Sequence, residues 1–145
     1  MKVVADTGPL VAATNRRDRA HKLAAFLVSE LGRELIIPDV VLVEVDQLLR
    51  ARVSKIAALA FLTAISAREH EVAFLSQGLL VRAVEIDGRF SDLDLGLVDA
   101  SVMAYAERHE LPILTFDFED FRAAPPKSGY WRLVVGETRY AEATG

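Results

Sequence analysis

The sequence contains no cysteine in its 145 residues. This absence excludes disulfide bonds, thiolate zinc sites and cysteine nucleophiles, and it fits a reducing compartment. The three histidines are scattered along the chain and do not form the HExxH spacing of a zinc protease. A metal site in this chain would therefore use oxygen ligands and hold a hard cation.

Long hydrophobic runs are also missing, although the chain as a whole is apolar. Hydrophobic residues make up 52% of it, and its mean hydropathy is +0.24. The longest nearly uninterrupted apolar stretch, residues 56–65, is ten residues long, whereas a membrane-spanning helix needs about 20. We therefore expect no membrane helix. No basic-then-apolar leader opens the chain either, which predicts a cytoplasmic protein.

Lysine is scarce, and the overall charge is acidic. Of the 17 basic residues only four are lysines, so arginine supplies the other 13, and the formal net charge is −4. An acidic balance argues against a classical basic nucleic-acid binder. That argument weakens if the acids bind metal, because a carboxylate cluster counts as negative until its cation arrives. Arginine suits phosphate and protein interfaces equally, so composition leaves both kinds of partner open.

Short apolar strands alternate with helices along the chain. The strands are expected at residues 2–5, 34–37, 71–75, 112–115 and 132–135. The helices are expected directly after the first strand and at residues 21–31, 39–52, 54–68, 76 onward and 96–109, with Asp39 and Ser54 as caps. This order predicts an α/β fold with a mainly parallel central sheet flanked by helices. We expect one domain over residues 1–145, with a loose tail from about residue 141.

Two aspartates follow expected strands. Asp6 comes directly after the first strand, and Asp117 comes two residues after the fourth. Ligands of open parallel sheets bind outside the carboxyl ends of the strands, so both aspartates lie where a site is expected. Surface turns also favour aspartate. For either residue alone, a structural role is therefore as well supported as a functional one.

Two further carboxylates fall on the apolar sides of expected helices. Glu44 lies within the stripe that Val41 and Leu48 define. Asp99, in the first turn of its helix, shares a side with Met103. A carboxylate on an apolar face must be protonated, paired or bound to a cation. The competing explanations are a buried ion pair with an arginine for Glu44 and helix capping for Asp99.

Taken together, these four acids predict a metal site. Such carboxylates cannot hold their charges close to one another without a divalent cation. Mg²⁺ or Mn²⁺ is the natural occupant, and its chemistry is the activation of water for attack on phosphorus. The sequence has no Walker A loop, no GxGxxG and no serine–histidine–aspartate set that would compete. We therefore predict a metal-dependent nuclease.

Four short blocks of sequence carry a family resemblance. In chain order they are Asp6-Thr7-Gly8-Pro9, Val43-Glu44, the segment 92–101 around Asp99, and Leu114-Thr115-Phe116-Asp117. Each block resembles a motif of the PIN domains, and the four stand in that family's order over nearly the whole chain. Size and spacing look most like the VapC-type toxins of bacterial and archaeal toxin–antitoxin pairs.

The resemblance implies a three-layer PIN-like fold and a Mg²⁺- or Mn²⁺-dependent endoribonuclease, usually a homodimer silenced by a cognate antitoxin protein. The resemblance also implies that four residues bind the metal and act in catalysis: Asp6, Glu44, Asp99 and Asp117. Thr7 and Thr115 would support these acids through hydroxyl contacts. Gly8 departs from many members of the family, which have serine or asparagine at this position, so one supporting side-chain contact is absent.

Two surface features predict how partners bind. Arg16, Arg17 and Arg19 are candidate RNA contacts, and a solvated turn explains them equally well. Residues 56–65 are apolar nearly all round, which predicts either a core helix or a groove for an antitoxin segment. The alternative function is a non-catalytic PIN-like module that binds RNA or protein without cutting.

Overall fold

The centre of the fold is a four-stranded parallel sheet, as the computed structural model of residues 1–145 shows. Its strands are β1 (Val3–Ala5), β2 (Leu35–Pro38), β3 (Glu71–Ala73) and β4 (Ile113–Leu114). They lie in the order β3-β2-β1-β4, and every pairing is parallel. The carboxyl ends of all four strands therefore meet at one edge of the sheet.

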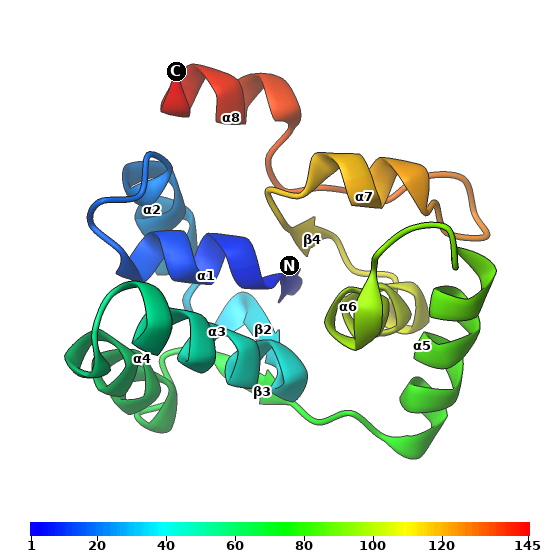
Figure 1. Ribbon diagram of the computed structural model, residues 1–145, viewed down its shortest axis with the longest axis horizontal. Coiled ribbons are helices and arrows are strands. Elements are labelled where there is room, and N and C mark those ends of the chain that lie inside the picture. The colour runs from blue at the N-terminus through cyan, green and yellow to red at the C-terminus, as the bar shows by residue number, and fades with distance from the viewer.

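Helices surround this sheet (Figure 1). They are α1 (Thr7–Thr14), α2 (His21–Leu31), α3 (Asp39–Arg52), α4 (Lys55–Ser66), α5 (Gln77–Arg89), α6 (Gly96–His109), α7 (Phe118–Ala123) and α8 (Glu137–Thr144), with a 3₁₀ turn, η1 (Gly32–Glu34). α1 packs against α2 and α3, α3 packs against α4, and α5 packs against α6. The predicted α/β fold, a parallel sheet flanked by helices, is confirmed.

The core forms where the helices cover the strands. All residues of β1 and β2 are buried, which is why these strands read as continuous apolar runs instead of alternating ones. Helical residues such as Val45, Leu49 and Met103 are fully buried in the same cluster. A rigid core beneath the carboxyl ends of the strands holds the residues that follow them in fixed positions. None of the helices is both long and apolar enough to span a membrane.

One of the two predicted helix caps is confirmed. Ser54 Oγ accepts a hydrogen bond from the Ala57 N–H at 3.0 Å and caps α4. Asp39 was wrongly assigned as a cap, since it is the first residue of α3 itself. Its Oδ1 accepts the N–H groups of Val40 at 2.9 Å and Leu75 at 3.2 Å. Asp39 thus ties the loop after β3 to the start of α3, a long-range contact that the spacing of residues does not reveal.

The C-terminal part of the chain differs from the prediction. The fifth strand is reduced to a single parallel bridge between Leu133 and Ile113, because β4 is only two residues long. The tail that was expected to be loose is helical, since α8 runs through Thr144. Tyr140 of α8 packs its ring against Phe116 and Phe118, with centroids 4.7 and 5.5 Å away. These aromatic contacts dock α8 beside the carboxyl end of β4.

Candidate metal and active site

A pocket of about 420 Å³ opens at the carboxyl ends of β1 and β4. β1 delivers Asp6 to it, and the turn after β4 delivers Asp117. α3 contributes Glu44, and the first turn of α6 contributes Asp99. The structure therefore brings all four predicted acids into one pocket, although they are up to 111 positions apart in the chain.

Asp6 is the most deeply held of these acids and is only 5% exposed. Its Oδ1 accepts the Thr7 N–H at 2.8 Å, so Asp6 caps α1, and its Oδ2 accepts the Thr115 hydroxyl at 2.7 Å. Burial raises the pKa of Asp6 above its ordinary value, and the charges of Asp117 and Glu44 raise it further, while the two hydrogen bonds oppose the shift. The Asp6 side chain thus both caps α1 and lines the pocket.

Thr115 links the two aspartates that follow the strands. Its hydroxyl donates to Asp6 and accepts the Asp117 N–H at 3.0 Å, and its side chain is fully buried. The Thr7 hydroxyl behaves differently, because its Oγ1 is buried without a hydrogen-bond partner. Thr7 therefore contacts Asp6 through its backbone N–H. A buried hydroxyl without a partner beside carboxylates is a natural place for an ordered water.

Asp99 makes no hydrogen bond or ion pair in the folded chain, and α6, whose N-cap residue is Leu95, has no side-chain cap. The capping explanation for Asp99 is therefore wrong. Burial, with added repulsion from Asp6, Asp117 and Asp120, raises the pKa of Asp99 from 3.8 to about 8. Without a cation, this carboxyl is mostly protonated at neutral pH.

Glu44 also has no ionic partner. The six ion pairs of the structure include none of the pocket acids, so the buried pair with an arginine is absent. Two residues further on, Asp46 pairs instead with Arg50 on the outer side of α3, at 3.0 Å. Glu44 is half-buried and lines the pocket. Both of its oxygens are free to accept hydrogen bonds from something that enters the pocket.

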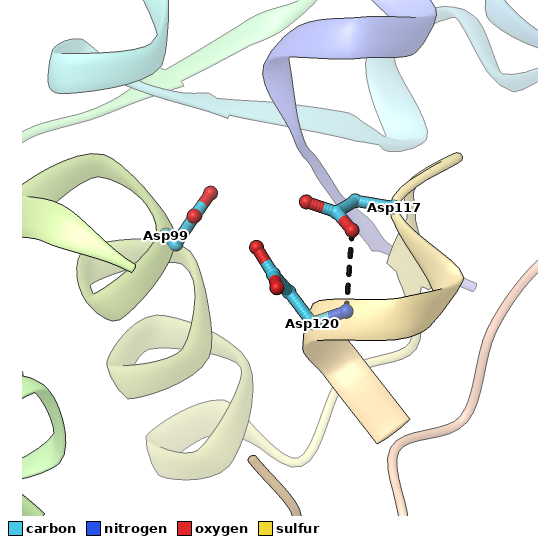
Figure 2. A group of neighbouring side chains, drawn as sticks. All are labelled: Asp99, Asp117 and Asp120. Atoms are coloured by element: carbon cyan, nitrogen blue, oxygen red, sulfur yellow. Dashed lines mark hydrogen bonds between the residues drawn. The ribbon is translucent and has the colours of Figure 1, made fainter. Parts of the chain in front are cut away.

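Asp120, which was not among the predicted residues, joins the cluster. Figure 2 shows the side chains of Asp99, Asp117 and Asp120 directed toward one another, and one carboxylate oxygen of each lies within 4.8 Å of the others. The Asp120 N–H donates to Asp117 Oδ1 at 3.2 Å, which makes Asp117 the cap of α7. Burial and the charge of Asp117 raise the pKa of Asp120. The available signal was an aspartate three residues after Asp117, in the first turn of a helix that was not predicted.

The three predicted RNA-contacting arginines lie outside the pocket. Arg16, Arg17 and Arg19 are exposed in the loop between α1 and α2. Asp18, between them, does line the pocket, and its Oδ1 accepts the Ala20 N–H at 2.8 Å. This loop therefore borders the pocket, with arginines on both sides of its inward-facing aspartate.

The donor set fits a hard divalent cation. Carboxylate oxygens converge with no protein cation paired to them, and no sulfur or imidazole group lines the pocket. Thr7, whose buried hydroxyl has no partner, belongs to the same pocket wall. Such oxygen-only sites suit Mg²⁺-like ions, and binding one removes the repulsion that raises the pKa of Asp99. The chain is thus an α/β protein with a cluster of carboxylates at the carboxyl ends of its parallel sheet, where ligands of such sheets bind.

The chain belongs to the PIN-domain family, whose model matches residues 3–125. It is similar to ribonuclease VapC26 of Mycobacterium tuberculosis, with 27% identity over 128 residues that cover 88% of this chain and 95% of that protein. The predicted family is thereby confirmed. PIN nucleases use a divalent metal, and this chain has a cluster of acids that suits one.

Solved structures share the fold. VapC20 of Mycobacterium tuberculosis, described as a toxin that cleaves the sarcin–ricin loop, has a TM-score of 0.75 at 24% identity, covering 84% of this chain and 95% of that one. The DNA-bound VapBC of Salmonella typhimurium has a TM-score of 0.68 at 16% identity, covering 92% and 96%. At these identities, the likeness establishes the arrangement of strands and helices.

Proposed function

We propose that this chain is a metal-dependent endoribonuclease and the toxin of a VapBC-type toxin–antitoxin pair. The observation that carries the proposal is the pocket itself, where the four predicted acids converge without any ion pair. Similarity to a protein named as a ribonuclease over 88% of the chain supports the reaction class. No feature of the structure favours the non-catalytic alternative.

The metal ligands are proposed to be the four predicted acids, with Asp120 as a further donor. Asp6, Glu44, Asp99 and Asp117 would hold Mg²⁺ or Mn²⁺. When bound, the cation supplies a polarised water and neutralises charge on the phosphate. The chain holds the ligands in place beforehand, since Thr115 fixes Asp6 by its hydroxyl and fixes the Asp117 backbone by accepting its N–H. Such supporting hydrogen bonds orient metal-binding carboxylates.

Glu44 is the residue we assign to the attacking water. Its carboxylate has no hydrogen-bond or ionic partner in the chain, so an oxygen that does not bind the cation can orient a water beside the scissile phosphate. Asp6 is less suited to this task because Thr7 and Thr115 each occupy one of its oxygens. Attack of water on phosphorus, with cleavage of the P–O3′ bond and transfer of a proton to the leaving 3′-oxygen, would leave a 5′-phosphate and a 3′-hydroxyl, the polarity that the PIN family implies.

An apolar groove gives the proposed antitoxin a place to bind. The groove has a volume of about 610 Å³ and lies between α1, α2 and α4, where Phe61 and Ile65 form part of its wall. The stretch 56–65 is only partly core, since Ala58 is fully buried while Ile56 is 81% exposed. We place an apolar segment of the cognate antitoxin in this groove.

Substitution of a groove residue tests this placement. Ala60→Glu puts a charge on the exposed wall of the groove, whereas Thr63→Glu puts one on the same helix outside it. We expect the first change to abolish co-purification of the antitoxin expressed from the neighbouring gene, and the second to leave it intact. Equal binding by both variants would contradict the placement.

A homodimer is the other proposed assembly. Leu80, Val81 and Val84 expose apolar side chains along α5, and a second copy of the chain would cover them.

A cytoplasmic location also stays a prediction.

The reaction itself is tested with purified protein and total RNA. Cutting with Mn²⁺ or Mg²⁺ that stops in EDTA, and that leaves 5′-phosphate ends, is the expected result. RNA binding without cutting, together with no metal binding by calorimetry, would favour the non-catalytic module. Clear metal binding without cutting would mean that the true substrate is different.

A further inference from the structure

The acidic pocket has a single basic residue in its wall. Five of the residues that line the pocket are acids, and Arg52 is the one cation among them. An RNA phosphate must approach this negative surface. A bound divalent cation offsets part of the negative charge of the acids. The neighbouring phosphates of the RNA strand lie outside the reach of that cation and need basic side chains on the protein surface.

The helix α3 places Arg52 on the side that faces the pocket. Glu44, Leu48 and Arg52 follow one another at intervals of four residues, and all three line the pocket. Residues at such intervals share one side of a helix. At a rise of about 1.5 Å per residue, Arg52 begins about 12 Å along the axis from Glu44. Arg52 therefore lines the same pocket as the acids but starts about two helical turns from Glu44, which favours contact with a neighbouring phosphate over the scissile one.

Arg52 is also free to bind. It is exposed, and none of the six ion pairs includes it. Arg50, two residues earlier, is committed, because its Nε contacts both oxygens of Asp46 at 3.0 Å. The helix dipole favours a basic residue at both Arg50 and Arg52, because both lie in the last turn of α3. The dipole does not explain why only Arg52 lines the pocket.

We propose that Arg52 binds a backbone phosphate of the RNA next to the scissile bond. Its planar guanidinium can form two parallel hydrogen bonds with phosphate oxygens. Asp18 also lines this pocket, and its two neighbours in the chain, Arg17 and Arg19, are exposed outside it. This assignment rests on the proposed ribonuclease function. It gives the site a substrate-binding residue that leaves metal binding untouched.

The test compares Arg52→Gln with Arg50→Gln, a matched change on the same helix outside the pocket. Cleavage of a labelled single-stranded RNA of mixed sequence is measured with Mn²⁺ at several salt concentrations. We expect Arg52→Gln to raise KM about tenfold with kcat changed little, and to reduce the slope of log affinity against log salt by about 0.7. Arg52→Lys should keep most of the slope. Arg50→Gln should behave like the wild type, since an exposed pair contributes little.

Two further measurements separate this inference from the proposed function. Mn²⁺ calorimetry should give the same affinity for Arg52→Gln and the wild type, and thermal unfolding should show that both variants are folded. Binding of the same RNA, followed by fluorescence anisotropy with Ca²⁺, reports the phosphate contact without cleavage. If the wild type binds RNA through Arg52 but neither cuts RNA nor binds Mn²⁺, the proposed function fails and the contact stands. If Arg52→Gln and Arg50→Gln bind and cut alike, or if the wild type binds no RNA, the role of Arg52 is refuted.

Discussion

Replacement of Asp99 by asparagine is expected to stabilise the metal-free protein. Burial and the neighbouring acids raise the pKa of Asp99 from 3.8 to about 8. A carboxyl whose pKa is raised by folding stays protonated in the native state while the unfolded chain releases its proton. Its stabilising contribution is therefore complete below about pH 4 and is lost as the pH rises toward 8. Asparagine has no charge to bury, so the variant avoids this loss.

The size of the effect follows from the pKa shift. Between pH 5 and pH 8, the shift corresponds to at most about 4 kcal/mol, at about 1.4 kcal/mol per pH unit. Because Asp99 is partly exposed, solvent screening reduces this free energy, and we take about 2 kcal/mol. In a chain of this length, 2 kcal/mol corresponds to about 6 °C in Tm. The Tm advantage of Asp99→Asn over the wild type should therefore grow by about 6 °C from pH 5 to pH 8.

The assay is thermal unfolding followed by circular dichroism in EDTA across this pH range. Asp92→Asn is the matched control, since Asp92 is exposed in the loop before α6 and does not line the pocket. Saturating Mn²⁺ should reverse the order, because a ligand at 100 times its Kd stabilises the wild type by about 2.7 kcal/mol. A lower Tm for Asp99→Asn than for the wild type at pH 8 in EDTA would refute the reasoning, as would an equal gain for Asp92→Asn.

Three other predictions follow from particular contacts. Thr115→Val removes the hydroxyl bonded to Asp6 and should lower the unfolding free energy by about 1–3 kcal/mol and Mn²⁺ affinity by about 10- to 100-fold, as measured by denaturant unfolding and calorimetry. Asp120→Asn should weaken Mn²⁺ binding, whereas Glu119→Gln, at an exposed neighbouring position, should not; equal affinities would remove Asp120 from the site. Val84→Asp should convert a dimer into a monomer in light scattering, with the helical circular dichroism unchanged, and a dimer that persists would exclude α5 as the interface.

Much of the fold was predictable because local patterns and the core agree. β1 and β2 are short apolar runs covered on both faces, and Gly96–His109 matches α6 residue for residue. The alternation of strands and helices then determines a parallel sheet, since each connection must cross over it. The regions where prediction failed are short or edge elements. The strand expected at 132–135 has only a two-residue neighbour to pair with, and the docking of α8 depends on rings distant in sequence.

The four acids could be found for a related reason. Asp6 and Asp117 follow strands whose carboxyl ends must meet, and Glu44 and Asp99 stand on helix faces that must turn inward. Asp120 and Arg52 were missed because their positions depend on tertiary geometry. Asp120 reaches the cluster through α7, a helix of six residues. Arg52 shares a side of α3 with Glu44, but only the folded chain shows that the pocket extends to the end of that helix.

The most direct test of the account pairs metal binding with RNA cleavage in the same preparations of four proteins. Calorimetry with Mn²⁺ and cleavage of a labelled RNA would be run on the wild type, Asp6→Asn, Asp99→Asn and the control Asp92→Asn. The account predicts that the wild type and Asp92→Asn bind metal and cut. Asp6→Asn and Asp99→Asn should be folded but lose metal affinity and more than about 100-fold of the cleavage rate. Cutting at the wild-type rate by either pocket variant would contradict the claim that this pocket is the catalytic metal site.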